Sequence, residues 1–234
     1  MTDAGPAPAA APGGRLILLL MGSVGAGKGT QAAALSDRLG LVHLASGNLF
    51  RQALRDGSAL GEQARSYMER GELVPDDVTI AMLGERIAQP DACGGFVLDG
   101  FPRTLDQALA LDRLLAARDA RVSGVLDIEV PADEIVRRLA GRLVCREASH
   151  PYHVTDAPPA VSGICDIDGS ELYHRDDDRE DVIRNRVAVF EQETRPVRDH
   201  YRALGTPIVT IDGARDRAEV EADLVEAVRA LGQS

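Results

Sequence analysis

Lysine is almost absent from this 234-residue sequence: 25 of its 26 basic residues are arginines, and the one lysine is Lys28. Arginine has taken the places where any cation would serve, so we expect Lys28 to have a role that needs lysine. The scarcity also excludes the GTP-binding switch proteins, because their guanine-recognition motif, Asn-Lys-x-Asp, would require another lysine.

Long apolar runs are also missing. A membrane-spanning helix needs about 18 to 20 consecutive apolar residues, whereas the only apolar run here is the short stretch 15–21. Residues 1–14 carry no Lys or Arg, unlike the start of a signal peptide, and a glycine-rich loop follows the run directly. We therefore expect a buried strand in a cytoplasmic protein with no membrane partner.

Cysteines are few and the charge balance is acidic. Three cysteines, an odd number without a secretion signal, do not make a disulfide framework, and we expect Cys93 to be a small core residue. The formal net charge of −11 argues against a nucleic-acid partner, because a surface that neutralises phosphates needs a basic face. Small anions can still bind, since a cleft can be locally positive in an acidic protein.

Short apolar runs alternate along the chain with longer helical patterns, which is typical of a parallel sheet covered by helices. Residues 1–14, mostly Ala, Pro and Gly, have little to bury and are predicted to be a disordered tail. The predicted fold class is α/β, with three layers around a five-stranded parallel sheet. Strands are predicted at residues 16–21, 42–45, 96–99, 125–130 and 208–211. Helices are predicted at residues 28–39, 76–89, 104–117, 132–142, 179–204 and 218–231.

Two stretches interrupt this alternation. Residues 46–74 are helical without an intervening strand, and residues 143–174 are rich in Pro, Gly, Asp and His. We expect both to be insertions at the mouth of the sheet. The core would then consist of residues 15–45, 75–142 and 175–234.

A glycine-rich segment, Gly22-Ser-Val-Gly-Ala-Gly-Lys-Gly-Thr30, follows the first predicted strand and precedes a helix. Glycines let successive N–H groups point inward, the helix N-terminus adds partial positive charge, and the lysine reaches the outer phosphates of a nucleotide. The hydroxyl comes one place later than in the strict pattern, so Thr30 is not assigned as a metal ligand. The predicted phosphate-binding residues are Gly25, Ala26, Gly27, Lys28, Gly29 and Thr30.

A carboxylate ends the third predicted strand. In phosphate-loop proteins an aspartate in the place of Asp99 lies near the loop and can hold Mg²⁺ directly or through water. Many ATP hydrolases carry a water-polarising glutamate at the next position, where this chain has Gly100. Transfer to a bound acceptor is therefore favoured over hydrolysis.

Several segments together resemble the adenylate kinases, nucleoside monophosphate kinases of the phosphate-loop type, in their form with a long lid. The Phe-Pro-Arg-Thr stretch followed by Gln107 is more specific than the phosphate loop, and the resemblance extends from Arg15 onward. It implies an AMP-binding insertion at 46–74, a lid at 143–174, and reversible transfer from Mg·ATP to AMP giving two ADP. The matching segments are Gly22–Thr30, Ser46-Gly-Asn48 with Arg51, Leu98–Thr104 with Gln107, and Arg175–Asp178 with Arg186.

Arginines suit this chemistry because the two nucleotides bring about six negative charges to one cleft. The resemblance implies that Arg51 and Arg103 hold the AMP phosphate and that Arg142 serves the ATP phosphates. Arg175 and Arg186 would lie between the nucleotides. Together with Lys28, the implied catalytic set is Arg103, Arg142, Arg175 and Arg186.

The resemblance also implies residues around the two bases. The AMP pocket would be lined by Ser46, Glu72, Leu73, Val74, Gly100 and Gln107, besides the arginines. Tyr152 and Arg215 would flank the ATP adenine, and Arg138 would join Arg142 at the ATP site, because residues four apart on a helix share a face. Two positions depart from the family: Ser46 replaces Thr and keeps the hydroxyl, whereas Asn48 replaces Asp and loses a charge, which leaves the affinity for AMP open.

Gln107 bears on the acceptor base. Its carboxamide offers a donor and an acceptor in one plane, which suits the adenine edge, where an amino donor lies beside a ring-nitrogen acceptor. We therefore expect ATP, AMP and ADP as ligands and a monomeric enzyme. Another monophosphate or small-molecule kinase on the same core is the nearest alternative, and a non-catalytic relative is a second, although every cation that the chemistry needs is present.

The lid carries part of a metal site. Zinc-bearing lids of this family have Cys-x₂-Cys and later Cys-x₂-Cys or Cys-x₂-Asp, which supply four tetrahedral ligands. The corresponding residues here are Cys145, Ala148, Cys165 and Asp168, so one ligand is missing. Either His150 completes a Cys₂-His-Asp zinc site, or the lid is held by hydrogen bonds without metal.

Overall fold

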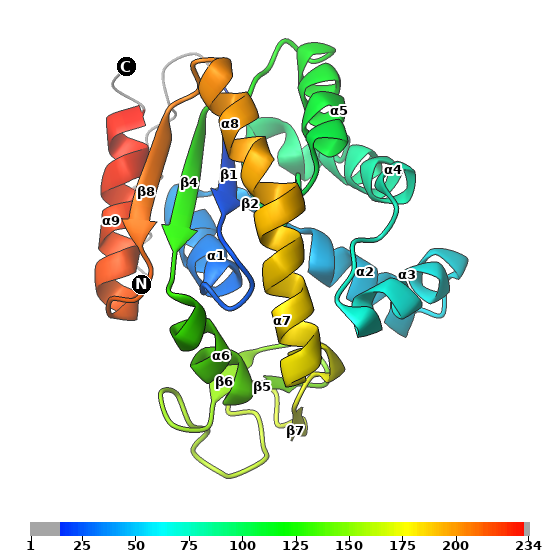
Figure 1. Ribbon diagram of the computed structural model, residues 1–234, viewed down its shortest axis with the longest axis vertical. Helices are drawn as coiled ribbons and strands as arrows, with labels where there is room; N and C mark the ends of the chain where they lie inside the picture. Colours follow the sequence, from blue (N-terminus) through cyan, green and yellow to red (C-terminus); the bar gives the residue numbers. More distant parts are fainter. Residues whose placement is uncertain (1–14, 232–234) are drawn as a thin grey trace, which may run out of the picture.

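The computed structural model describes residues 15–231 (Figure 1). The predicted tail, residues 1–14, lies outside the described residues. A five-stranded sheet with parallel strands in the order β2-β3-β1-β4-β8 forms the centre, which confirms the predicted α/β class. Its strands are β1 (Leu16–Met21), β2 (Val42–Ala45), β3 (Gly95–Asp99), β4 (Gly124–Glu129) and β8 (Ile208–Asp212).

Side chains of β1 alternate between two hydrophobic cores, because successive residues of a strand point to opposite faces of the sheet. Ile17, Leu19 and Met21 pack in the core that includes residues of α4 (Asp76–Ile87), α5 (Leu105–Ala116) and α8 (Arg195–Ala203). Leu18 and Leu20 pack in the opposite core, with α1 (Lys28–Leu39) and α9 (Arg217–Leu231). Each such buried side chain contributes roughly 1.5 to 3 kcal/mol, so β1 holds the two helical layers together.

The predicted AMP-binding insertion consists of two helices, α2 (Ser46–Arg55) and α3 (Ala59–Arg70). Ser58 caps α3, since its hydroxyl accepts from the Gly61 N–H at 3.1 Å and donates to the Ala53 carbonyl at 2.8 Å. Gly61 is required for the close approach of the helices, because a Cβ there would lie 2.3 Å from the Ala53 carbonyl carbon. The insertion therefore forms a compact helical hairpin at the edge of the core.

The predicted lid follows α6 (Ala132–Ala140) and contains a small antiparallel sheet in the order β6-β5-β7. Its strands are β5 (Arg142–Cys145), β6 (Pro151–His153) and β7 (Leu172–Tyr173). In Figure 1 the arrowheads of β4 and β8 point towards the lid, so the lid lies at the carboxyl ends of the central strands.

The predicted helix 132–142 was too long, and the idea that Arg138 and Arg142 share a helical face is wrong. The helix α6 ends at Ala140, and Arg142 is the first residue of β5. Gly141 is the turning point, because a Cβ on it would lie 2.3 Å from the His153 ring, which belongs to the neighbouring strand.

The predicted helix 179–204 has three parts: α7 (Glu180–Val189), a π-helical segment (Phe190–Thr194) and α8. Pro196, near the start of α8, has no N–H to continue the α-helical pattern, which accounts for the change of register before it. Short 3₁₀ turns lie at Pro90–Gly94 and Asp176–Asp178. Among the described residues, no helix is long and apolar enough to cross a membrane.

Cys93 is not the core residue that we expected. It is exposed in the 3₁₀ turn before β3, whereas its neighbour Ala92 is buried against the core. A tight turn leaves room inside for the smaller alanine side chain and directs the thiol outward.

Candidate active site

The glycine-rich segment forms the predicted loop between β1 and the N-terminus of α1. Gly27 precedes the helix with a φ of 86°, a left-handed conformation that glycine adopts without strain. Lys28 begins the helix, and its Nζ donates a hydrogen bond to the Ser23 carbonyl at 2.7 Å, so the ammonium group folds back over the loop. The backbone N–H groups, the helix N-terminus and this ammonium group together make an anion site.

The electrostatic surroundings of Lys28 lower its pKa to about 8. Burial is the main cause, since it disfavours the charged form. The positive charges of Arg103, Arg186 and Arg142 lower the pKa further, and the carboxylate of Asp99 opposes them. Lys28 therefore lies within a group of cations whose positive charge nearby carboxylates neutralise only in part.

Asp99 ends β3 beside the loop, as predicted. Its Oδ2 lies 3.5 Å from the position that a Cβ on Gly29 would take, and 3.4 Å from Nε2 of His43. Burial by itself raises the pKa of Asp99, but the hydrogen bond with His43 and the charges of Lys28 and Arg103 outweigh it and hold the pKa below its ordinary value. The group is thus an anionic oxygen ligand at the phosphate loop, the type that Mg²⁺ prefers.

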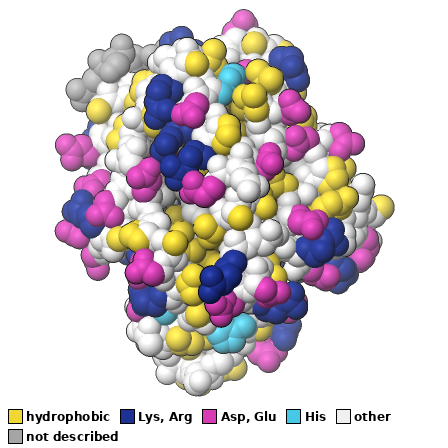
Figure 2. Space-filling model, viewed as in Figure 1, with side chains coloured by type: hydrophobic (Ala, Val, Ile, Leu, Met, Phe, Trp, Pro, Cys, Tyr) yellow, Lys and Arg dark blue, Asp and Glu magenta, His cyan; other side chains and the backbone are white. Residues whose placement is uncertain are grey.

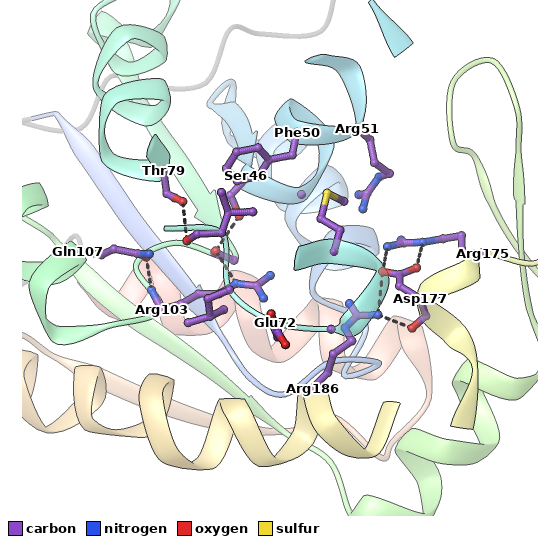
Figure 3. Close-up of a pocket in the computed structure, with 16 residues that line it drawn as sticks. Ser46, Phe50, Arg51, Glu72, Thr79, Arg103, Gln107, Arg175, Asp177 and Arg186 are labelled. Atoms are coloured by element: carbon purple, nitrogen blue, oxygen red, sulfur yellow. Dashed lines mark hydrogen bonds and ion pairs between the residues drawn. The ribbon is translucent and has the colours of Figure 1, made fainter. Parts of the chain in front are cut away.

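A pocket with about 580 Å³ of empty space, open to solvent on one side, lies between the core and α2 and α3 (Figure 3). We call it the insertion pocket. All ten residues predicted for AMP line it: Ser46, Arg51, Glu72, Leu73, Val74, Gly100, Arg103, Gln107, Arg175 and Arg186. Its further lining residues are Gly47, Phe50, Met68, Gly71, Thr79 and Asp177.

Hydrogen bonds hold one wall of the insertion pocket in place. Gly100 follows β3 with a φ of 73°, and its carbonyl accepts from Ser46 Oγ at 2.7 Å and from Arg103 Nε at 2.8 Å. Arg51 donates to Asn48 Oδ1 at 2.5 Å. The neutral amide of Asn48 therefore still positions this guanidinium group but does not cancel its charge.

Several cations lie together in the lining of the pocket. Burial, followed by the charge of Arg175, lowers the pKa of Arg51 to about 9. Burial also lowers the pKa of Arg186 to about 10; nearby Asp177 opposes this shift, and the charge of Arg175 adds to it. Burial lowers the pKa of Arg103 as well. Shifts of this kind show that the cleft disfavours its own cations until an anion arrives.

Three arginines around the second insertion pair with two aspartates. Figure 3 shows two of these arginines, Arg175 and Arg186, beside Asp177. Arg175 and Arg186 both contact Asp177, with the Arg186 Nη1 to Oδ2 distance at 2.9 Å. Arg142 pairs with Asp178, its Nε lying 2.7 Å from Oδ2. Because each carboxylate fixes the plane of a guanidinium fork, the remaining N–H groups are oriented before any ligand binds.

Gln107 closes the inner end of the insertion pocket and is only 2% exposed. Its Oε1 accepts the backbone N–H of Arg103 at 2.8 Å, and its Nε2 donates to Asp76 Oδ1 at 2.7 Å. The side chain is thus anchored at both ends of its amide group while it lines the pocket. Figure 3 shows its contact with Arg103.

The residues predicted for the ATP base are less closely grouped. Arg138 pairs with Glu134 on α6 at 2.7 Å, and Arg215 pairs with Asp223 at 2.5 Å on the surface. The hydroxyl of Tyr152 accepts the Asp166 N–H at 2.7 Å inside the lid. The structure therefore places Arg142 with the central cations, whereas contacts of Arg138, Tyr152 and Arg215 with adenine stay predictions.

Four lid residues form a cluster whose ligand atoms all lie within 4.8 Å of one another: Cys145, His150, Cys165 and Asp168. Nδ1 of His150 lies 3.4 Å from each cysteine sulfur and 3.1 Å from Asp168 Oδ2. Ser149 has a left-handed φ of 59°, which turns the chain so that His150 comes back to Cys145. Because zinc–ligand bonds are about 2.0 to 2.3 Å, tetrahedral ligands lie roughly 3.3 to 3.8 Å apart. The distances from His150 Nδ1 to the other three donor atoms are close to this spacing.

Two residues of the site, His43 and Asp76, were not predicted from the sequence. His43 is a polar residue within the buried strand β2, and Asp76 is one of two acidic residues in the first turn of α4. A polar residue inside an apolar strand is a usable signal for the first. An acidic helix start is too common to have identified the second.

Comparisons with known proteins agree with this geometry. The adenylate kinase family model matches residues 20–206. An adenylate kinase of Streptomyces griseus is 51% identical over 91% of this chain and 97% of its own length, and one of Carboxydothermus hydrogenoformans is 47% identical over 91% and 99%. One of Staphylococcus aureus is 44% identical over 89% and 97%. With its phosphate loop, arginine cluster and insertion pocket, the chain belongs to the adenylate kinase family.

Proposed function

We propose that AMP binds in the insertion pocket and that the phosphates of ATP bind on the loop around Lys28. The reaction is that of the family: ATP and AMP give two ADP, reversibly and with Mg²⁺. One observation carries the assignment of the sites. A pocket with buried, under-neutralised cations at its mouth and an anchored carboxamide at its inner end complements a nucleoside monophosphate and adjoins the phosphate loop.

The phosphates are held by the cations that the fold brings together. Arg51 and Arg103 bind the AMP phosphate, and Lys28 and Arg142 bind the ATP phosphates. Arg175 and Arg186, oriented by Asp177, lie between them and stabilise the charge on the transferring group. Because the groups are oriented before binding, catalysis comes from positioning and charge stabilisation, with in-line transfer and no covalent enzyme intermediate.

Asp99 fits the magnesium ion that accompanies ATP. It is an anionic carboxylate beside the phosphate loop, and it would hold the ion directly or through water. When bound, the ion would supply positive charge that screens the phosphate oxygens. The protein itself contributes the carboxylate and its orientation through His43.

The lid covers the ATP site when both nucleotides are bound. Closure excludes water that could otherwise accept the phosphoryl group. Gly100, in place of a water-polarising acid, leaves no carboxylate at that position to activate water. Tyr152 is carried towards ATP by this movement, whereas Arg138, on α6, and Arg215 approach ATP from the core side.

We further propose that the lid binds one structural zinc through Cys145, Cys165, His150 and Asp168. Support comes from the donor types and from the 3.1 to 3.4 Å separations of His150 Nδ1 from its neighbours. The lid core is small, with only Cys145, Cys165 and Leu172 buried in its main cluster. Zinc would supply the cross-link that so few apolar contacts do not.

We also propose that the enzyme is a cytoplasmic monomer. The thiols of Cys93, Cys145 and Cys165 are free, as expected in a reducing compartment.

An acceptor panel tests the proposed function. With Mg·ATP in a coupled assay, AMP is expected to be phosphorylated far faster than GMP, CMP or UMP, because Gln107 complements the adenine edge. Comparable rates with UMP would show that the pocket recognises the phosphate and not the base.

A further inference from the structure

Asp76 is the first residue of α4 and lies behind Gln107, outside the set of residues that line the insertion pocket. Each of its two carboxylate oxygens accepts a hydrogen bond from a different residue at the start of α5. Oδ1 accepts from Nε2 of Gln107 at 2.7 Å, and Oδ2 accepts from the hydroxyl of Thr104 at 2.7 Å. The carboxylate therefore contacts the residue proposed to recognise the base, but does not itself face the pocket.

The helix ends around this carboxylate stabilise it. Asp76 lies in the first turn of its own helix, where the helix dipole favours negative charge. Thr104 caps α5, its hydroxyl accepting the Gln107 N–H at 3.2 Å while donating to Asp76. The carboxylate of Asp76 therefore lies near a pocket for an anionic substrate, and none of these contacts comes from a basic side chain.

The partners of the Gln107 amide permit only one orientation. An ionised carboxylate accepts hydrogen bonds and donates none, whereas a backbone N–H only donates. The amide must therefore turn its NH₂ group to Asp76 and its oxygen to the Arg103 N–H. A flipped amide would place oxygen against carboxylate and NH₂ against N–H, and would lose both hydrogen bonds.

The orientation decides which base edge the pocket complements. After its two anchors, the amide keeps one N–H and one oxygen lone pair for a ligand. In the fixed orientation the oxygen accepts from the 6-amino group of adenine and the N–H donates to N1. A 6-oxopurine such as hypoxanthine presents the reverse pattern, an acceptor at position 6 and a donor at N1, and would match only the flipped amide.

We propose that Asp76 is a specificity-determining positioning residue, which locks the Gln107 amide in the orientation that accepts 6-aminopurine and rejects 6-oxopurine nucleotides. The inference rests on the proposed role of Gln107 in base recognition. It goes beyond that role, because an unlocked glutamine would serve either base by turning its amide.

The test compares AMP with IMP, which differ at position 6 and N1 only, as acceptors for Mg·ATP, with products separated by chromatography. For Asp76→Ala, the ratio of kcat/KM for AMP to that for IMP is expected to fall by about tenfold, the scale of a hydrogen bond to a charged group. The KM for ATP should not change. Asp76→Asn, nearly isosteric, should also lower the ratio, because its own amide can turn to satisfy either orientation of Gln107.

Asp77→Ala is the matched control. Asp77 is the adjacent carboxylate in the same helical turn, but it is exposed, so its removal makes the same charge change without touching Gln107. Its AMP-to-IMP ratio should equal that of the wild type. Gln107→Met, which keeps the shape but not the hydrogen bonds, reports separately on base recognition.

The outcomes separate the two proposals. If Gln107→Met lowers the ratio and both Asp76 variants leave it unchanged, the role of Asp76 is overturned and that of Gln107 stands. If the activities with AMP and IMP fall in proportion in the Asp76 variants, Asp76 is only structural. An unchanged ratio in Gln107→Met would overturn both, because the base would be recognised elsewhere.

Discussion

Lys28 and Arg103 illustrate how single residues carry this site. Both lie in a solvent-accessible cleft, and each lowers the electrostatic cost of bringing phosphates together. Replacing either with Met is expected to reduce turnover by roughly 10²- to 10⁵-fold, the scale of losing a phosphate-directed cation, with little change in thermal stability. Steady-state kinetics and thermal melting check both statements.

Arg121→Met is a suitable control for these variants. Arg121 is exposed and precedes β4, at the end of the parallel sheet opposite the site. Its replacement therefore removes an equal charge far from the phosphates. Its turnover should be that of the wild type. A Lys28 or Arg103 variant that loses less than tenfold would mean that the phosphates bind elsewhere.

The lowered pKa of Lys28 predicts a pH dependence of ATP binding. In the folded, empty enzyme the lysine loses its proton near pH 8, whereas an unfolded chain keeps it until about 10.5. Between these values the unfolded state binds more protons, so at this residue the stability of the empty enzyme rises with pH. The affinity for ATP changes in the opposite direction and should weaken above about pH 8, as measured by calorimetry.

Lys28→Arg distinguishes this residue from other titrating groups. Arginine keeps its charge throughout this range, so the decline in ATP affinity near pH 8 should disappear in the variant. The same decline in both proteins would assign the titration to another group.

At the scale of elements, the lid combines a small apolar core with a cluster of four potential metal ligands. Protein purified without chelator is expected to contain near one zinc per chain by elemental analysis, because four donor atoms of the types that zinc prefers already lie within 4.8 Å of one another. Cys165→Ser should lose the metal, and His150→Ala should weaken it. In the presence of chelator, the melting temperature of the lid should be lower than that of the core.

Other results would change this assignment. Zinc well below one per chain, with no effect of chelator on lid melting, would mean that hydrogen bonds hold the lid together. Unchanged zinc affinity in His150→Ala would show that water or another group supplies the fourth ligand. Cys93→Ser, at an exposed thiol outside the lid, is the control and should retain full zinc content.

On the scale of the whole molecule, the acidic net charge and the basic cleft are compatible because the two are separated in space. Figure 2 shows basic and acidic side chains interspersed over the face crossed by α7 and α8. The excess of cations lies instead at the carboxyl ends of the strands, where burial gives it the greatest effect. Nucleotide anions are thus attracted to one place on an acidic protein.

We expect the working enzyme to be a monomer. Light scattering after size-exclusion chromatography should give the mass of one chain, with and without nucleotides. Specific activity should not change with enzyme concentration. A dimer whose activity falls on dilution would contradict this prediction.

Local sequence determined the elements and the loop. Leu16–Met21, Lys28–Leu39 and Val42–Ala45 have the predicted bounds, because apolar runs, glycines and helical periodicity act over a few residues. The phosphate loop could likewise be predicted from one short stretch of sequence. All ten predicted AMP residues line one pocket. They come from distant parts of the chain, and the family resemblance, unlike hydrophobic periodicity, indicates which distant segments lie together.

Tertiary structure decided the contacts between distant elements. Asp99 meets His43 across 56 residues and Gln107 meets Asp76 across 31, and no spacing rule relates such pairs. Arg142 lies outside its predicted helix because Gly141 packs closely against the His153 ring. His150 contacts Cys165 because the fold of the lid brings these two residues together. Hydrogen bonds and close contacts between separate strands and helices depend on how those elements pack, so the fold as a whole was needed to reveal them.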